Sequence, residues 1–107
     1  MAKYLIKASY SSEGIKGVMA KGGSARADAI GKLASGVGGS VECVYFAFGD
    51  DDLVAIIEAP SNEAMAAIAG TVCQTGALSS YETVALLTPA QMDEAAKITV
   101  DYTPPGS

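Results

Sequence analysis

The sequence predicts an α+β domain whose elements follow the order β-α-β-β-α-β, with one more helix at the C-terminal end. The first observation behind this prediction is residues 41–60, two long apolar runs joined by the acidic turn Asp50-Asp51-Asp52, a pattern typical of a β-hairpin. The second is that a helical spacing of apolar residues and one further strand pattern lie on each side of this hairpin. The third is size, because 107 residues, 50% of them hydrophobic, suffice for one core but not for two.

The N-terminal half is expected to contain one strand and two helical segments. Residues 3–10 are predicted to form the strand, because Tyr4, Ile6 and Ala8 alternate with the residues between them. A helical pattern covers residues 13–35, but Gly22-Gly23 interrupts it, and adjacent glycines are costly inside a helix. We therefore expect a short helix, a break, and a second helix capped by Ser24.

The remaining elements follow from turn and cap signals. Strands are predicted at residues 40–48, 53–59 and 79–87, and a helix at residues 62–74 that ends before Gly76. Thr88-Pro89 is a typical start for the last helix, which should end near residue 97. Split βαβ units in this order form a ferredoxin-like fold, a four-stranded antiparallel sheet with helices on one face. The domain should span residues 1–98, and residues 99–107 should form a flexible tail.

The hairpin strands also predict an assembly. They are apolar at nearly every position, whereas a strand with one wet face should alternate. Both faces of the sheet are therefore expected to be covered, one by helices and the other by a second copy of the chain. The expected partner is thus the chain itself, in a homo-oligomer.

Composition argues against several classes of function. The formal net charge of -5 and the pI of about 4.4 argue against nucleic-acid or anionic-membrane partners, which need clustered Lys and Arg. The chain has no His, which removes the commonest catalytic base near neutral pH and a frequent metal or haem ligand, so no cofactor is expected. Cys43 and Cys73 lie outside any CxxC motif, and no signal-peptide pattern is present, so a cytoplasmic location is expected.

Several short motifs between about residues 3 and 96 resemble those of one family. They are Glu13-Gly14-Ile15-Lys16-Gly17, the hairpin run Tyr45-Phe46-Ala47-Phe48-Gly49-Asp50-Asp51-Asp52, Glu58-Ala59-Pro60 and Leu86-Leu87-Thr88, together with Tyr4, Tyr10, Arg26 and Gly38-Gly39. In these motifs the chain is similar to the GYD-domain family, a group of small bacterial proteins related to the dimeric α/β-barrel superfamily. The resemblance implies sheet faces paired in an oligomer. One departure is that Asp51 stands where the family has the tyrosine of its Gly-x-Tyr-Asp motif.

The resemblance leaves the activity open, because the wider superfamily includes cofactor-free monooxygenases, isomerases and haem enzymes. Three functions remain. The first is binding of a small molecule in a pocket beside the sheet. The second is a structural or interaction subunit without a ligand, and the third is a cofactor-free oxidoreductase or isomerase.

Lys7 and Glu58 are the main candidates for a ligand site. Both interrupt strands that should be central and adjacent, and alternation places them on one face of the sheet. A charge among apolar side chains needs a partner, so we expect Lys7 to pair with Glu58. Such a pair would anchor a polar ligand or act as acid and base, or it would only fix the strand register.

Three further side chains are expected to line the ligand pocket. Tyr10 and Tyr45 lie on strands, as does Tyr81, and strand tyrosines can donate a hydrogen bond into a pocket or simply complete a core. Arg26 is a cation near the start of the second helix. The three adjacent carboxylates of Asp50, Asp51 and Asp52 lack the spacing of a calcium loop, so we expect no metal there.

Overall fold

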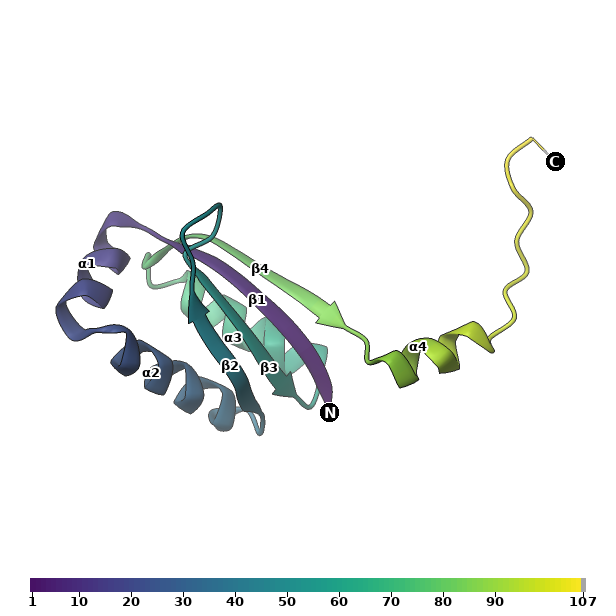
Figure 1. Ribbon diagram of the computed structural model, residues 1–107, viewed down its shortest axis with the longest axis horizontal. Helices are drawn as coiled ribbons and strands as arrows, with labels where there is room; N and C mark the ends of the chain where they lie inside the picture. The colour runs from purple at the N-terminus through teal and green to yellow at the C-terminus, as the bar shows by residue number, and fades with distance from the viewer. Residues whose placement is uncertain (107) are drawn as a thin grey trace.

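The computed structural model describes residues 1–106 and consists of a four-stranded sheet with helices on one face (Figure 1). The elements, in chain order, are β1 (Ala2–Tyr10), α1 (Ser12–Lys21), α2 (Gly23–Gly36), β2 (Ser40–Phe46), β3 (Leu53–Ala59), α3 (Asn62–Cys73), β4 (Leu78–Leu86) and α4 (Pro89–Ala96). The strand order is β2-β3-β1-β4, and every neighbouring pair is antiparallel. The ferredoxin-like architecture predicted from the sequence is therefore confirmed.

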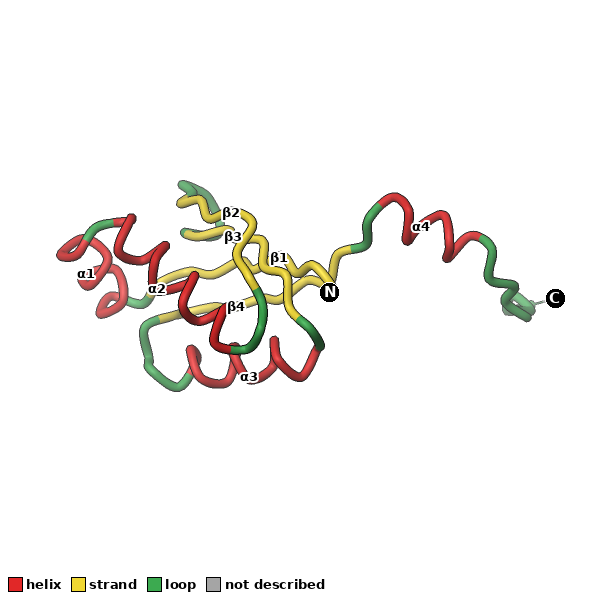
Figure 2. The backbone as a smooth tube through the Cα atoms, turned by 90° about the horizontal axis from the view of Figure 1, so that it is seen from below, coloured by secondary structure: helices red, strands yellow, loops and turns green. Residues whose placement is uncertain are grey.

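One face of the sheet forms the core. The buried side chains of β1 and β3 alternate along the strands, and they pack against α2 and α3, which lie on the same side of the sheet (Figure 2). Helix α2 lies against β2 and β3, whereas α3 lies against β3 and β4. The core residues are Tyr4, Ile6, Leu53, Ala55, Ile57 and Ala59 from the sheet, with Ala34, Met65 and Ile68 from the helices.

The break between α1 and α2 lies two residues earlier than the predicted cap. Gly22 has a φ of 90°, in the region that favours glycine, and its N–H donates to the carbonyl of Val18, at 2.7 Å. The same residue is the N-cap of α2, which begins at Gly23. Ser24 is therefore inside the first turn, and the prediction that it caps α2 is wrong, because the glycine conformation reverses the chain before the serine is reached.

The acidic turn folds back onto β1. The strand β2 ends at Phe46, earlier than predicted, and the backbone N–H of Asp52 donates to the carbonyl of Ala8, at 2.9 Å. The carboxylate of Asp52 accepts a hydrogen bond from the backbone N–H of Tyr10, also at 2.9 Å. Asp51 lies 3.6 Å from the ammonium of Lys7. Two of the three turn carboxylates thus hold the hairpin connection against the end of β1.

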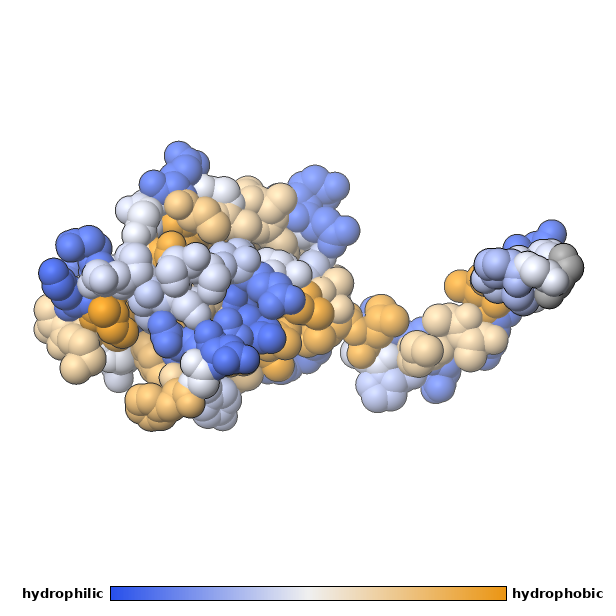
Figure 3. All heavy atoms as spheres, turned by 90° about the horizontal axis from the view of Figure 1, so that it is seen from above, coloured by the Kyte–Doolittle hydropathy of each residue, from blue (hydrophilic) through white to orange (hydrophobic). Residues whose placement is uncertain are grey.

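The chain leaves the body of the protein after β4. Helix α4 and residues 97–106 extend away from the sheet as an arm (Figures 1 and 3). The radius of gyration is 17.0 Å, against about 13 Å expected for a compact chain of this length. Apolar side chains along and beside the arm are 59–75% exposed: Leu87, Met92, Ile98, Val100 and Tyr102. None of the helices within residues 1–106 is both long and apolar enough to cross a membrane.

Candidate functional site

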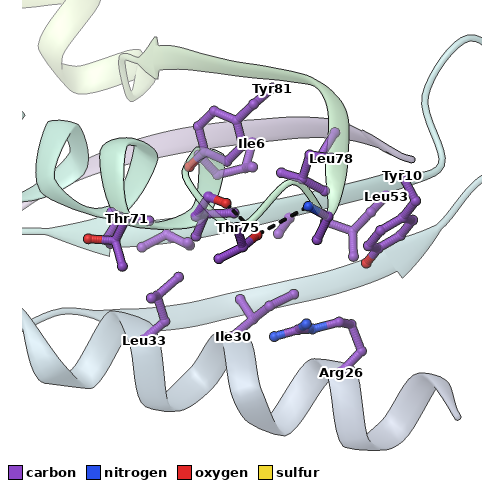
Figure 4. A pocket seen from close by; sticks show the side chains of 16 residues that line it. Ile6, Tyr10, Arg26, Ile30, Leu33, Leu53, Thr71, Thr75, Leu78 and Tyr81 are labelled. Atoms are coloured by element: carbon purple, nitrogen blue, oxygen red, sulfur yellow. Dashed lines mark hydrogen bonds between the residues drawn. The ribbon is translucent and has the colours of Figure 1, made fainter. Parts of the chain in front are cut away.

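A cavity of about 250 Å³ lies between the sheet and helices α2 and α3. Its walls are mostly aliphatic and come from β1, β3, α2, α3 and β4 (Figure 4). Two of the strand residues that line it are the small side chains of Ala8 and Ala55. Because an alanine leaves space that a leucine or isoleucine would fill, these positions help to keep the core open between the two helices.

Besides Thr71 and Thr75, three larger polar side chains line this cavity. Tyr10 lies at the end of β1, Arg26 in the first turns of α2, and Tyr81 on β4. Figure 4 shows the hydroxyl of Tyr10 turned toward the guanidinium of Arg26, with Tyr81 farther along the cavity beside Ile6. The structure therefore brings together two of the predicted site residues, Tyr10 and Arg26.

Neither Arg26 nor Tyr81 has a partner for its polar group within residues 1–106. The cation of every ion pair in this part of the chain is a lysine, so the guanidinium of Arg26 has no carboxylate beside it. The hydroxyl of Tyr81 is buried and makes no hydrogen bond. Buried polar groups are normally satisfied, and an orphaned one is costly. The cavity thus presents a donor and a cation that the chain itself leaves free.

Burial raises the pKa of both cavity tyrosines. Burial raises the pKa of Tyr10 above its ordinary value, while the charge of Arg26 lowers it and that of Asp52 raises it to smaller extents. Burial is also the main cause that raises the pKa of Tyr81. The nearby Thr83 opposes that increase in the pKa of Tyr81, without reaching hydrogen-bonding geometry with its hydroxyl. Both hydroxyls therefore remain hydrogen-bond donors at neutral pH.

A surface groove adjoins the cavity. It has a volume of about 440 Å³, lies between α1 and α2, and shares Tyr10, Arg26 and Ala77 with the cavity. Its floor depends on a close approach at Gly14, where a Cβ atom would lie 1.9 Å from the carbonyl oxygen of Ala77. Ser11 fixes the same contact, because its backbone N–H donates to Ala77 at 2.9 Å and its hydroxyl donates to the carbonyl of Gly76 at 2.7 Å. Tyr10 and Arg26 thus stand where the groove meets the cavity.

The predicted Lys7–Glu58 pair does not form. Both residues lie on one face of the sheet, as alternation predicted, and this is the face away from the helices. The register, however, places Lys7 opposite Val54 and Glu58 opposite Lys3. Lys7 contacts Asp51 at 3.6 Å and Glu82 at 3.8 Å, whereas Glu58 lies 3.6 Å from Lys3. Lys3 also pairs with Glu42, which a β-bulge in β2 leaves beside it. The two residues were predicted on the same face correctly. The pairing failed because, in the observed register, Lys7 and Glu58 lie four residues apart along the strands.

The open face of the sheet, opposite to the helices, has an apolar centre between these two groups of charges. Tyr45 lies here, opposite Val54 and 68% exposed, on the other side of the sheet from the cavity. The half-buried side chains of this centre are Leu5, Cys43, Val54, Ile56, Val84 and Leu86. Lys7, Glu58 and Tyr45 therefore belong to one surface, and Tyr10 and Arg26 to another.

Two features of the site were missed by sequence reasoning. Lys3 was not a candidate, because its place opposite Glu58 depends on the register between β1 and β3, two strands that no short turn connects. Tyr81 was considered only as one of several strand tyrosines, because its missing hydrogen-bond partner is a property of the packed core. In the part of the chain that the structure describes, no three His, Cys, Asp or Glu side chains gather as a metal site. Both cysteines are free thiols, Cys73 at the surface and Cys43 on the open face.

Comparison with known proteins supports the fold and assigns a family. No curated protein matches the sequence. A solved structure described as the crystal structure of FFRP-DM1 is similar in fold, with a TM-score of 0.54 and 16% sequence identity, over 81% of this chain and 100% of that chain. The model of the GYD domain matches residues 4–96. The chain therefore belongs to the GYD-domain family, as the motifs around Gly14 and the hairpin predicted.

Proposed function

We propose that the protein binds a small, largely apolar molecule in the cavity between the sheet and helices α2 and α3. The observation that carries the proposal is an aliphatic cavity of about 250 Å³ that contains the buried, unpartnered hydroxyl of Tyr81. A smaller apolar cavity of about 150 Å³ is already enough to bind benzene. A ligand with one hydrogen-bonding atom would satisfy the hydroxyl and fill the space at once.

The direct test is a titration with an uncharged amphiphile, octan-1-ol, followed by ¹H–¹⁵N NMR. We expect chemical-shift changes at residues that line the cavity, and we expect Val72→Phe, which places a larger ring in the cavity wall, to abolish them. The matched control is Val100→Phe, the same substitution in the exposed arm, which should bind as the wild type does. Shift changes confined to the open face of the sheet, or binding that survives Val72→Phe, would contradict the proposal.

A second function, self-assembly, is favoured by the open face and the arm. The open face is roughly 19 Å by 28 Å, from about 4.8 Å per strand and about 3.4 Å per residue, or about 530 Å². A stable interface buries about 800 Å² per partner. The sheet face alone is therefore smaller than a standard interface, and the exposed apolar residues of the arm, which continues directly from β4, would supply further area on a second copy of the chain.

The assembly is tested by sedimentation velocity at micromolar concentration. We expect the full chain to be a homo-oligomer, Ile56→Asp in the centre of the open face to dissociate it, and removal of residues 88–107 to weaken it. The control is Ile15→Asp, since Ile15 lies on α1 and is also accessible to solvent, but is far from the open face. A wild-type chain that sediments as a monomer would rule out assembly.

A further inference from the structure

The feature that carries a further inference is the unpaired guanidinium of Arg26 at the mouth of an aliphatic cavity. Arg26 is half-buried, and it takes part in no ion pair within residues 1–106. A cation in such surroundings loses part of its hydration and gains most from an anion with matching geometry. The planar fork of a guanidinium matches a carboxylate, which it can hold through two parallel hydrogen bonds.

The other groups at this mouth fit a carboxylate as well. The hydroxyl of Tyr10 is turned toward the side chain of Arg26 and is protonated, so it is a further donor at this mouth (Figure 4). The acidic group that acts on Tyr10, the carboxylate of Asp52, already accepts a hydrogen bond from the backbone of Tyr10. Glu13 and Lys21 line the groove outside the cavity, one of each sign, so they leave its net charge unchanged.

The rest of the cavity restricts the body of the ligand. Its volume of about 250 Å³ is just below the roughly 300–1,000 Å³ of sites for drug-sized molecules. The walls beyond Arg26 are aliphatic, with Ile30, Leu33, Ile68 and Val72 among them. The body must therefore be short and apolar, and the hydroxyl of Tyr81 offers one hydrogen bond to an oxygen or nitrogen on it.

We infer that the ligand is a small amphipathic carboxylic acid, bound with its carboxylate on Arg26 and Tyr10 and its apolar body in the cavity toward Tyr81. The inference rests on the proposed function, because it requires the cavity to be a binding site. It goes further by assigning the ligand's charge, its orientation and the side of entry. The carboxylate of the ligand lies at the end of the cavity that adjoins the groove between α1 and α2. The ligand would therefore enter from this groove.

The experiment compares three probes of equal chain length, namely octanoate, octan-1-ol and octylamine, at pH 7.5 by NMR titration. In the wild type we expect octanoate to bind at least about tenfold more tightly than octan-1-ol, since a hydrogen bond to a charged group contributes roughly that factor or more. Octylamine should bind most weakly, because its ammonium would lie against Arg26.

The variants separate the charge from the cavity. Arg26→Gln should remove the preference for octanoate over octan-1-ol, because it removes the charge that the carboxylate would contact. Arg26→Lys should keep part of the preference, because it retains the charge without the fork, and Tyr10→Phe should reduce it by a few-fold. Lys32→Gln, which removes a cation from an exposed position on the same helix, is the matched control and should bind all three probes as the wild type does.

The two possible failures are distinguishable. If no probe binds in the cavity of the wild type, the proposed function fails and the ligand class with it. If octan-1-ol binds in the cavity but octanoate is not preferred, or if Arg26→Gln weakens both probes equally, the cavity remains a binding site and the carboxylate assignment is overturned.

Discussion

The two faces of the sheet differ in whether their charged and polar groups have partners within the chain. On the open face, Lys3 and Lys7 each lie within ion-pair distance of two carboxylates. On the helix-covered face, Arg26 has no ion-pair partner among the described residues, and the hydroxyl of Tyr81 has no hydrogen-bond partner. The difference indicates where a bound ligand would be stabilised most. A polar group that already has a partner in the chain adds little to the binding free energy of a ligand, whereas a group without a partner adds more. The ion pairs of the open face, in contrast, are suited to fix the alignment of neighbouring strands.

The largest expected effect separates the two faces at adjacent residues of β3. Ile57 faces the helices and is 2% exposed, whereas Ile56 faces outward and is half-buried. We expect Ile57→Ala to lower the free energy of unfolding by about 2–5 kcal/mol, and Ile56→Ala to lower it by about 1 kcal/mol at concentrations where the chain is monomeric. Urea unfolding measures both. Equal losses at low concentration would show that the open face is as well packed as the core, and the contrast between the faces would be wrong.

The next effect compares two tyrosines on the helix-covered face. The hydroxyl of Tyr4 donates to the side chain of Asn62 at 2.6 Å, whereas that of Tyr81 has no partner. Tyr4→Phe should therefore destabilise the unliganded protein by about 0.5–1.5 kcal/mol, and Tyr81→Phe should leave its stability unchanged or increase it by about 1 kcal/mol. Thermal unfolding of the two variants in parallel checks this. A destabilising Tyr81→Phe would mean that its hydroxyl is satisfied in solution, and the case for a polar contact to the ligand would weaken.

Alkaline pH should lower the stability of the protein through groups on both faces of the sheet. Burial raises the pKa of Tyr10 and of Tyr81 above the ordinary value of 10.0, and the hydrogen bond to Glu42 is the main cause that raises the pKa of Lys3 above 10.5. In each case the folded state holds its proton more tightly than the unfolded state. The stability is therefore fully present below pH 10 and is lost as the pH rises through the raised values. We expect unfolding midpoints to fall above pH 10, and the fall to be smaller in the Tyr10→Phe, Tyr81→Phe double variant. If the unfolding midpoint of that variant fell with pH as steeply as that of the wild type, the burial of these hydroxyls would be contradicted.

The sequence contained enough to predict the fold, because the fold depends on patterns that recur along the chain. Apolar alternation, adjacent glycines and the Thr88-Pro89 cap each mark an element locally, and the element order then leaves few topologies. The faces of the strands were predicted for the same reason, since period-two alternation needs no knowledge of the partner strand.

The site could be predicted only in part, because it depends on register and on packing. The register between β1 and β3 decides which lysine meets Glu58, and two strands without a short turn between them leave no clear register signal in one sequence. Tyr10 and Arg26 were found as residue types suited to a pocket, but their shared cavity depends on the positions of α2 and α3 against the sheet. Tyr45 lies on the opposite face of the sheet from Tyr10 and Arg26. The sequence does not show which face Tyr45 occupies, because β2 has apolar residues on both of its faces.

The smallest expected effect tests the register of the open face. In the structure Glu58 is opposite Lys3 and lies four strand positions from the row of Lys7, which corresponds to about 13 Å along the strand. At physiological ionic strength charges at that separation are largely screened, since the Debye length is about 8 Å. The effects of Lys7→Met and Glu58→Gln on the free energy of unfolding should therefore add to within about 0.5 kcal/mol. The matched cycle of Lys3→Met with Glu58→Gln should show a small coupling that decreases as salt is added, because the two side chains form an exposed ion pair. If instead Lys7 and Glu58 were coupled and Lys3 were not, β1 and β3 would pair in solution in a register shifted by four residues. The open face would then be the surface on which a charged pair could hold a ligand.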